Sequence, residues 1–106
     1  MFKVILSDEA EIALDKFADQ DKQDVDKWLE QLKSWRPDKF ISRMGGLILG
    51  NGEKLYILKT DNEIRLVFKK DARRITVTQI FPTEAVRRRV LDKARKTRRA
   101  RIAQAS

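Results

Sequence analysis

The 106-residue sequence contains no cysteine and no histidine, and it has four glycines, two prolines and one tyrosine. Without cysteine the chain forms no disulfide and offers no thiolate nucleophile. Without histidine it lacks the most common zinc ligand and the one side chain that titrates near neutral pH unaided. If the chain is an enzyme, its proton transfers depend on Lys, Tyr, Asp or Glu, and we expect neither a metal nor a cofactor.

Long hydrophobic runs are missing too. No stretch of 18 residues is continuously apolar, so we expect no membrane-spanning segment and no membrane partner. The apolar run Phe2–Leu6 is short and lacks the basic start, the length and the cleavage site of a secretory signal, so we expect a cytoplasmic protein. A chain of this length predicts one domain over residues 1–106, of which residues 98–106 are expected to fray.

Charge is abundant and unevenly distributed. Residues 1–50 carry 8 Lys and Arg against 10 Asp and Glu, whereas residues 51–106 carry 16 against 6. Nine of the basic residues fall within Arg87–Arg101, where Asp92 is the one acid. Such a field attracts polyanions and accelerates their encounter with the protein, which favours a nucleic acid or an acidic protein as partner over a merely solvated tail.

Hydrophobic periodicity predicts an α+β domain. A strand over Phe2–Leu6 precedes a helix capped by Ser7, and a polar break at Asp19–Asp21 leads to a second helix that stops before Pro37. These two amphipathic helices form a hairpin. Residues 36–53 are expected to be irregular, with apolar side chains that anchor them to the domain.

Three closely spaced strands are expected next, over Lys54–Thr60, Glu63–Lys70 and Arg73–Phe81. Turns this tight make neighbouring strands antiparallel. Thr83 is expected to cap a last helix that ends near Ala100. The predicted fold is a small antiparallel sheet with an N-terminal helical hairpin on one face and a basic C-terminal helix, in the order β-α-α-β-β-β-α.

The other face of the sheet is a candidate cationic surface. If Lys59, Arg65, Lys69 and Arg74 share it, they offer fixed positive charge to a phosphodiester, because arginine grips phosphate oxygens bidentately and lysine supplies compact charge or a proton. RNA carries its own nucleophile, the 2′-hydroxyl, so an enzyme needs only to align it, move its proton and stabilise the phosphorane. The alternative is an ordinary solvated sheet face.

One turn decides whether two of these cations are neighbours. A two-residue loop at residues 61–62 pairs Lys59 with Ile64 and sends Lys59 and Arg65 to opposite faces. A three-residue loop at residues 60–62 puts Lys59 and Arg65 on one face. The residues alone leave both registers open.

The order of elements resembles the RelE/ParE superfamily, the toxins of bacterial type II toxin–antitoxin modules. The opening strand and Ser7–Ala10 are similar to the family's first strand and its "S-x-E-A" helix start. Leu55–Lys59 and Ile64–Phe68 resemble its "L-Y-x-L-R/K" and "Y-R-[LVI]-[VLI]-[YF]" strands. The resemblance covers almost the whole chain, and it favours the loop of odd length.

The resemblance implies a toxin that inhibits translation as a ribosome-dependent mRNA endonuclease, with the ribosome, mRNA and a cognate antitoxin as partners. The family's active-face positions map to Lys59 and Arg65, which are therefore the expected catalytic residues. The residues expected to bind nucleic acid are Lys69, Arg74, Arg87, Arg88, Arg89, Lys93 and Arg95.

The chain departs from the family pattern after its last strand. The RNases of the superfamily carry a basic or His residue and then a Tyr there, whereas this chain has Phe81–Val86, and Ile64 replaces the Tyr before the arginine. Glu84, Arg87 or Arg88 are the available substitutes. Two alternatives stay open: a non-enzymatic toxin of the same fold that poisons DNA gyrase, and a nucleic-acid-binding domain without toxicity.

The basic half also predicts the form of the antitoxin. We expect an acidic segment, disordered when free, that folds along the sheet and the last helix on binding. Its carboxylates are expected to pair with Arg65 and part of Arg87–Arg101. The apolar residues that it is expected to cover are Val67, Val86, Val90 and Leu91.

Overall fold

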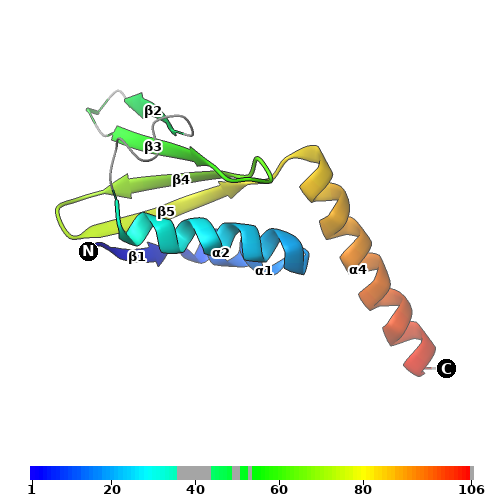
Figure 1. Cartoon of the computed structure of the whole chain (residues 1–106). Helices are drawn as coiled ribbons and strands as arrows, with labels where there is room; N and C mark the ends of the chain where they lie inside the picture. Colours follow the sequence, from blue (N-terminus) through cyan, green and yellow to red (C-terminus); the bar gives the residue numbers. More distant parts are fainter. Residues whose placement is uncertain (36–43, 49–50, 53, 106) are drawn as a thin grey trace.

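The computed structural model describes residues 1–35, 44–48, 51–52 and 54–105. The elements are β1 (Lys3–Leu6), α1 (Asp8–Asp15), α2 (Asp19–Lys33), β2 (Met44–Ile48), β3 (Lys54–Lys59), β4 (Arg65–Lys70), β5 (Arg74–Phe81) and α4 (Glu84–Ala105). Figure 1 shows α1 and α2 on one side of the sheet and α4 leading away from it. The predicted α+β class and the predicted order of elements are confirmed, with one strand more than expected.

The sheet has the strand order β1-β5-β4-β3-β2. Strands β2 to β5 pair antiparallel, whereas β1 lies parallel to β5, so the sheet is mixed rather than purely antiparallel. The extra strand, β2, lies inside the segment that we expected to be irregular, and residues 36–43 of that segment lie outside the described residues. Gly45 and Gly46 concealed β2, because glycine has low β-propensity.

The helical hairpin begins at the predicted cap. The Ser7 hydroxyl accepts a hydrogen bond from the Ala10 amide (3.1 Å) and donates one to the Thr78 carbonyl (2.8 Å), so the cap also ties α1 to β5. The predicted polar break at Asp19–Asp21 is wrong, because those residues form the first turn of α2. Their carboxylates suit the positive N-terminal end of a helix.

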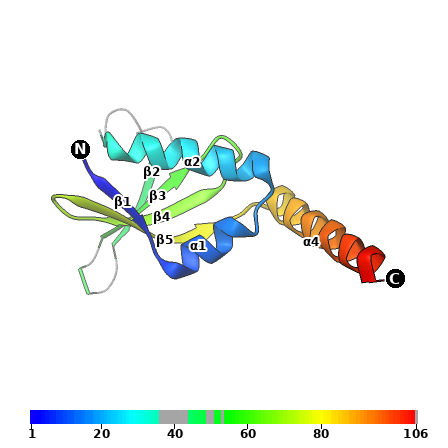
Figure 2. The same ribbon diagram turned by 90° about the horizontal axis from the view of Figure 1, so that it is seen from below.

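The core lies between this hairpin and one face of the sheet. Figures 1 and 2 both show α1 and α2 against the same side of the strands. The strands contribute the fully buried side chains Leu58, Leu66, Phe68, Ile75 and Val77, and the residue before β4 contributes Ile64. Burial of each Leu or Phe contributes roughly 1.5–3 kcal/mol. Because side chains alternate along a strand, this core fixes which residues point to the open face.

The first turns of α4 anchor it to the body. The Thr83 hydroxyl accepts a hydrogen bond from the Val86 amide (3.4 Å), which is the predicted cap. Val86 is fully buried, and Val90 packs against the core. The helix then leads away from the sheet and ends at Ala105, beyond the expected end near residue 100, in a molecule that measures 55 × 26 × 25 Å.

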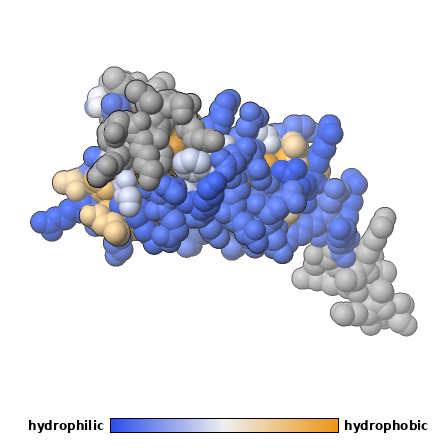
Figure 3. Space-filling model, in the orientation of Figure 1, coloured by the Kyte–Doolittle hydropathy of each residue, from blue (hydrophilic) through white to orange (hydrophobic). Residues whose placement is uncertain are grey.

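One face of the molecule is largely polar. Figure 3 shows one face on which hydrophilic residues dominate and apolar patches are small. Two of the exposed large hydrophobic residues are Phe81, at the end of β5, and Leu91, about two turns into α4. In the part of the chain that the structure describes, no helix has the length and hydrophobicity needed to cross a membrane.

Candidate functional site

The register of β3 and β4 decides which side chains share the open face. Lys59 lies directly opposite Arg65, and Leu58 lies opposite the buried Leu66. Directly opposite residues point to the same face with Cβ atoms about 5 Å apart. Lys59 and Arg65 are therefore neighbours on the face away from the helical hairpin. Like charges directly opposite each other on a sheet are destabilising.

The connection between these strands is a three-residue loop, Asp61–Glu63. The Thr60 amide donates to the Ile64 carbonyl (2.9 Å), and the Glu63 amide donates to the Thr60 carbonyl (3.0 Å). Glu63 has a φ of 61°, the left-handed conformation that the third residue of such a loop adopts. The two-residue loop considered above is wrong. The loop over residues 60–62 had the right length but lay one residue too early.

The other two predicted sheet cations also lie on the open face. Lys69 pairs with Thr76 of β5, and Arg74 stands two residues before Thr76 on the same side. Lys69 lies four positions after Arg65, which is about 13 Å along a strand. Lys59 and Arg65 therefore form one cationic group at one end of the face, and Lys69 and Arg74 form another.

A pocket of about 380 Å³ opens where the end of β3 and the start of β4 meet the start of α4. Its lining residues are Lys59, Glu63, Arg65, Phe81, Pro82, Thr83 and Arg87. Both predicted catalytic residues are among them. Arg87, expected only to bind nucleic acid or to replace a missing group, joins them because the cap at Thr83 starts α4 beside the pocket.

The charges of this basic pocket suit a phosphate group. Three cations and one carboxylate line it, and the positive N-terminal end of α4 lies at its edge. Two guanidinium groups can grip phosphate oxygens bidentately. The other two substitutes considered from the sequence do not line the pocket. Glu84 and Arg88 instead form an exposed pair on α4, with 3.6 Å between the carboxylate oxygen and Arg88 Nε.

The chain's one tyrosine lies on the other face of the sheet. Tyr56 is opposite Phe68, and their rings stack with centroids 5.5 Å apart. The Trp35 ring contacts both rings edge-on, at 5.5 and 5.6 Å. Since the chain has no histidine, the candidate groups for proton transfer in the basic pocket are Lys59 and Glu63.

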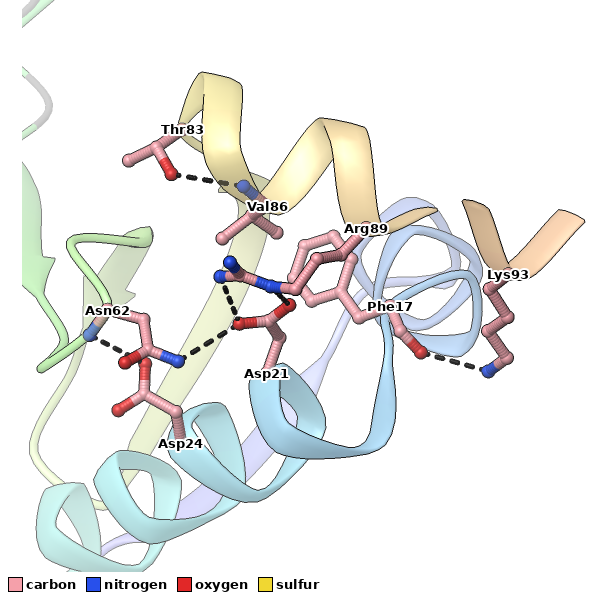
Figure 4. A network of polar contacts seen from close by, with 8 residues as sticks. All are labelled: Phe17, Asp21, Asp24, Asn62, Thr83, Val86, Arg89 and Lys93. Atoms are coloured by element: carbon pink, nitrogen blue, oxygen red, sulfur yellow. Dashed lines mark hydrogen bonds and ion pairs between the residues drawn. The ribbon is translucent and has the colours of Figure 1, made fainter. Parts of the chain in front are cut away.

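A buried polar network holds α4 and the β3–β4 loop to α2, as Figure 4 shows. The fully buried Asp21 carboxylate accepts hydrogen bonds from Arg89 Nε (2.8 Å), from a second Arg89 nitrogen (2.9 Å) and from the Asn62 side-chain amide (3.0 Å). Asp24 accepts from the Asn62 backbone amide (3.1 Å). Burial raises the pKa of Asp21, but the hydrogen bonds from Arg89 and Asn62 and the charge of Arg89 outweigh burial and lower the pKa below its ordinary value.

Two of the predicted nucleic-acid-binding residues of α4 make contacts inside the molecule. Arg89 binds Asp21, and Lys93 Nζ donates to the Phe17 carbonyl (2.9 Å) in the turn between α1 and α2. The periodicity of a basic helix does not reveal such contacts, because they depend on acceptors far away in the sequence. The exposed members of that set on α4 are Arg87, Arg88 and Arg95.

An apolar groove of about 370 Å³ lies beside the basic pocket. Its lining residues are Ala13, Lys16, Phe17, Pro82, Arg87, Val90 and Leu91, and two of them also line the pocket. Leu91 is 56% exposed. Val67 and Val86 are already buried in this chain, so the expectation that a partner covers them is wrong, whereas Val90 and Leu91 belong to the groove.

Comparison with known proteins gives no match: no family model fits the chain, and neither the curated proteins nor the solved structures contain a match to it. The functional interpretation therefore depends on the geometry of the basic pocket and on the motifs in the sequence.

Proposed function

We propose that the chain is a toxin of the RelE/ParE type that acts in the cytoplasm as a ribosome-dependent mRNA endonuclease. One observation carries the proposal: Lys59, Arg65 and Arg87 line a single pocket, although β3, β4 and α4 contribute them separately. The resemblance selects Lys59 and Arg65 by motif. Their direct pairing across the sheet supports a shared role.

In the proposed reaction the scissile phosphate of mRNA occupies the basic pocket. Arg65 and Arg87 donate hydrogen bonds to the non-bridging oxygens and stabilise the charge that develops on the phosphorane. Lys59 gives a proton to the leaving oxygen. Loss of one such donor typically lowers the rate by about 10²–10³.

Exposed cations outside the basic pocket are the proposed docking residues for RNA. Arg88 and Arg95 on α4 and Arg74 on the sheet lie outside the basic pocket. Their proposed role is to contact phosphates around the cleavage site and to fix its register, which makes binding fall with salt.

The test is induction of the wild-type chain and of single variants in bacteria, with growth and mRNA ends followed together. Lys59→Ala and Arg65→Ala are expected to abolish growth arrest and cleavage. Arg73→Ala is the matched control, because Arg73 is exposed at the opposite end of the β4–β5 hairpin. Growth arrest without cleavage contradicts the endonuclease, and normal cleavage by Arg65→Ala contradicts the mechanism in which Arg65 stabilises the phosphorane.

The second candidate is a non-enzymatic toxin of the same fold that poisons DNA gyrase. The position of Tyr56 favours it, because this side chain stacks in the aromatic cluster on the core face and no other tyrosine or histidine exists in the chain. A gyrase poison traps cleaved DNA and induces a DNA-damage response while protein synthesis initially continues. Harmless overproduction at high yield supports the third reading, a nucleic-acid-binding domain without toxicity.

The proposed partner is an acidic antitoxin segment that covers the apolar groove beside the basic pocket. Apolar residues of α1 and α4 line the groove. Lys16 and Arg87 also line it, and their charges can pair with carboxylates of the segment. A segment seated there reaches the pocket through Arg87, which lines both. Apolar anchors slow its release, while the basic helix speeds its association.

A further inference from the structure

Glu63 occupies a backbone conformation that non-glycine residues seldom adopt. Its φ is 61°, and it is the one non-glycine residue with a positive φ in the described part of the chain. Glycine is the residue that the third position of a three-residue hairpin loop favours, because it has no Cβ to clash there. The sequence thus keeps a glutamate where a glycine relieves strain.

The neighbours of Glu63 hold this conformation in place. Asn62, the preceding residue, is fixed through its backbone by Asp24 (3.1 Å) and through its side chain by the buried Asp21 (3.0 Å), as Figure 4 shows. On the other side, the Ile64 amide donates to the Thr60 hydroxyl (3.0 Å). A strained residue persists where its surroundings determine it this fully, and such residues cluster at functional sites.

The side chain that this loop presents is the one carboxylate among the lining residues of the basic pocket. Its companions there include Lys59, Arg65 and Arg87. Cleavage by the 2′-hydroxyl needs a group that accepts the proton of that hydroxyl, while the cations stabilise the phosphate. A carboxylate meets that need, and the pocket contains neither histidine nor tyrosine.

We infer that Glu63 is the general base of the reaction, an inference that rests on the proposed endonuclease function. The Glu63 carboxylate takes the proton of the 2′-hydroxyl, and the 2′-oxygen bonds to phosphorus. The bond between phosphorus and the 5′-oxygen breaks, and the Lys59 ammonium group protonates that oxygen. The products are a 2′,3′-cyclic phosphate and a 5′-hydroxyl, and proton exchange with water restores both side chains.

The alternative is that Glu63 is an ordinary exposed turn residue, and three variants separate the two readings. Glu63→Gly removes the carboxylate and relieves the backbone. Glu63→Gln removes the charge and keeps the shape. Glu30→Gln is the control, because Glu30 is 70% exposed and pairs with Lys33 on α2, away from the pocket. Purified full-length chains are compared on ribosomes programmed with mRNA.

We expect Glu63→Gly to unfold at the wild-type temperature or up to about 4 °C higher, because it relieves the left-handed residue. Cleavage by Glu63→Gly and Glu63→Gln is expected to fall by about 10²–10⁴, the usual contribution of a general base. Added formate is expected to restore part of the activity of Glu63→Gly, where it has room, and none of that of Glu63→Gln. Glu30→Gln cleaves like the wild type.

The outcomes distinguish this inference from the proposed function. If the wild type cleaves mRNA and Glu63→Gln cleaves at the same rate, the inference is overturned and the endonuclease stands. If the wild type does not cleave programmed mRNA, both are overturned. Loss of cleavage in both Glu63 variants, without loss of thermal stability, supports Glu63 as the general base.

Discussion

The ion pair between Asp21 and Arg89 joins α4 to α2, and the Arg89→Ala substitution tests how much that pair stabilises the fold. Arg89→Ala removes both hydrogen bonds that α4 makes to the Asp21 carboxylate. That carboxylate has no exposed surface, so water cannot replace the lost donors without rearrangement. Its remaining donor is the Asn62 side-chain amide. The variant therefore leaves a buried charge with one partner.

The expected loss of stability follows from these exposures. Removal of one member of a buried pair costs about 3–5 kcal/mol, whereas exposed pairs contribute about 0–1 kcal/mol. The Arg89 side chain is 33% exposed, and the Asn62 bond survives, so we place the free energy of unfolding lost by Arg89→Ala near the low end, about 3 kcal/mol. For a domain of this size that lowers the unfolding temperature by roughly 12–20 °C.

The measurement is thermal and urea unfolding followed by circular dichroism. Arg88→Ala is the matched control on the same helix, since its 3.6 Å pair with Glu84 is exposed on both sides, and we expect a change within about 1 kcal/mol. The double variant Asp21→Asn/Arg89→Ala is expected to lose less free energy of unfolding than the two single variants lose when their losses are added, because it leaves no unpaired charge.

A small effect of Arg89→Ala refutes this reasoning. If the variant unfolds within about 1 kcal/mol of the wild type, the ion pair merely offsets the cost of its own burial. The buried Val86 and the half-buried Val90 then hold α4 by apolar contact alone. Arg89→Lys distinguishes charge from geometry, because a lysine cannot form the two parallel bonds.

Two further predictions concern charge. The pKa of Asp21 is lowered on folding, so its stabilisation is complete above its ordinary pKa of 3.8 and is lost as the pH falls through the lowered value. When the free energy of unfolding is measured as the pH is lowered below about 4, the wild type is therefore expected to lose stability that the Asp21→Asn variant does not lose. Reversal of Arg87, Arg88 and Arg95 to Glu is expected to slow association with an acidic partner and to flatten its salt dependence in stopped-flow measurements, without the loss of folding stability that reversal of Arg89 entails.

Sequence periodicity predicted the elements whose cause is local. Alternation in β4 assigned Leu66 and Phe68 to the core, and the side-chain caps Ser7 and Thr83 marked the starts of two helices. The strand β2 was missed, because Gly45 and its neighbour lack β-propensity and the pairing of β2 with β3 supplies its stability instead.

The site depended on facts that no local pattern contains. Whether Lys59 and Arg65 share a face depended on the number of residues in one loop, since a shift of one residue sends a side chain to the other face. Arg87 lines the basic pocket because of the direction in which α4 runs from the end of β5. Tertiary packing determines that direction. A usable signal did exist for Glu63: a tight hairpin loop without glycine forces some other residue into the left-handed conformation.

The uneven charge of the sequence has two separate meanings in the fold. Part of it is satisfied internally, since the acidic first half supplies Asp21 to Arg89 of the basic second half. In the reverse direction, Lys27 of α2 binds Asp61 of the β3–β4 loop at 2.6 Å. Both contacts converge on the loop and helix that border the basic pocket. Charges that a sequence count assigns to an external polyanion thus include ones that hold the borders of the pocket together, and Arg65 and Arg87 are among the cations that line it.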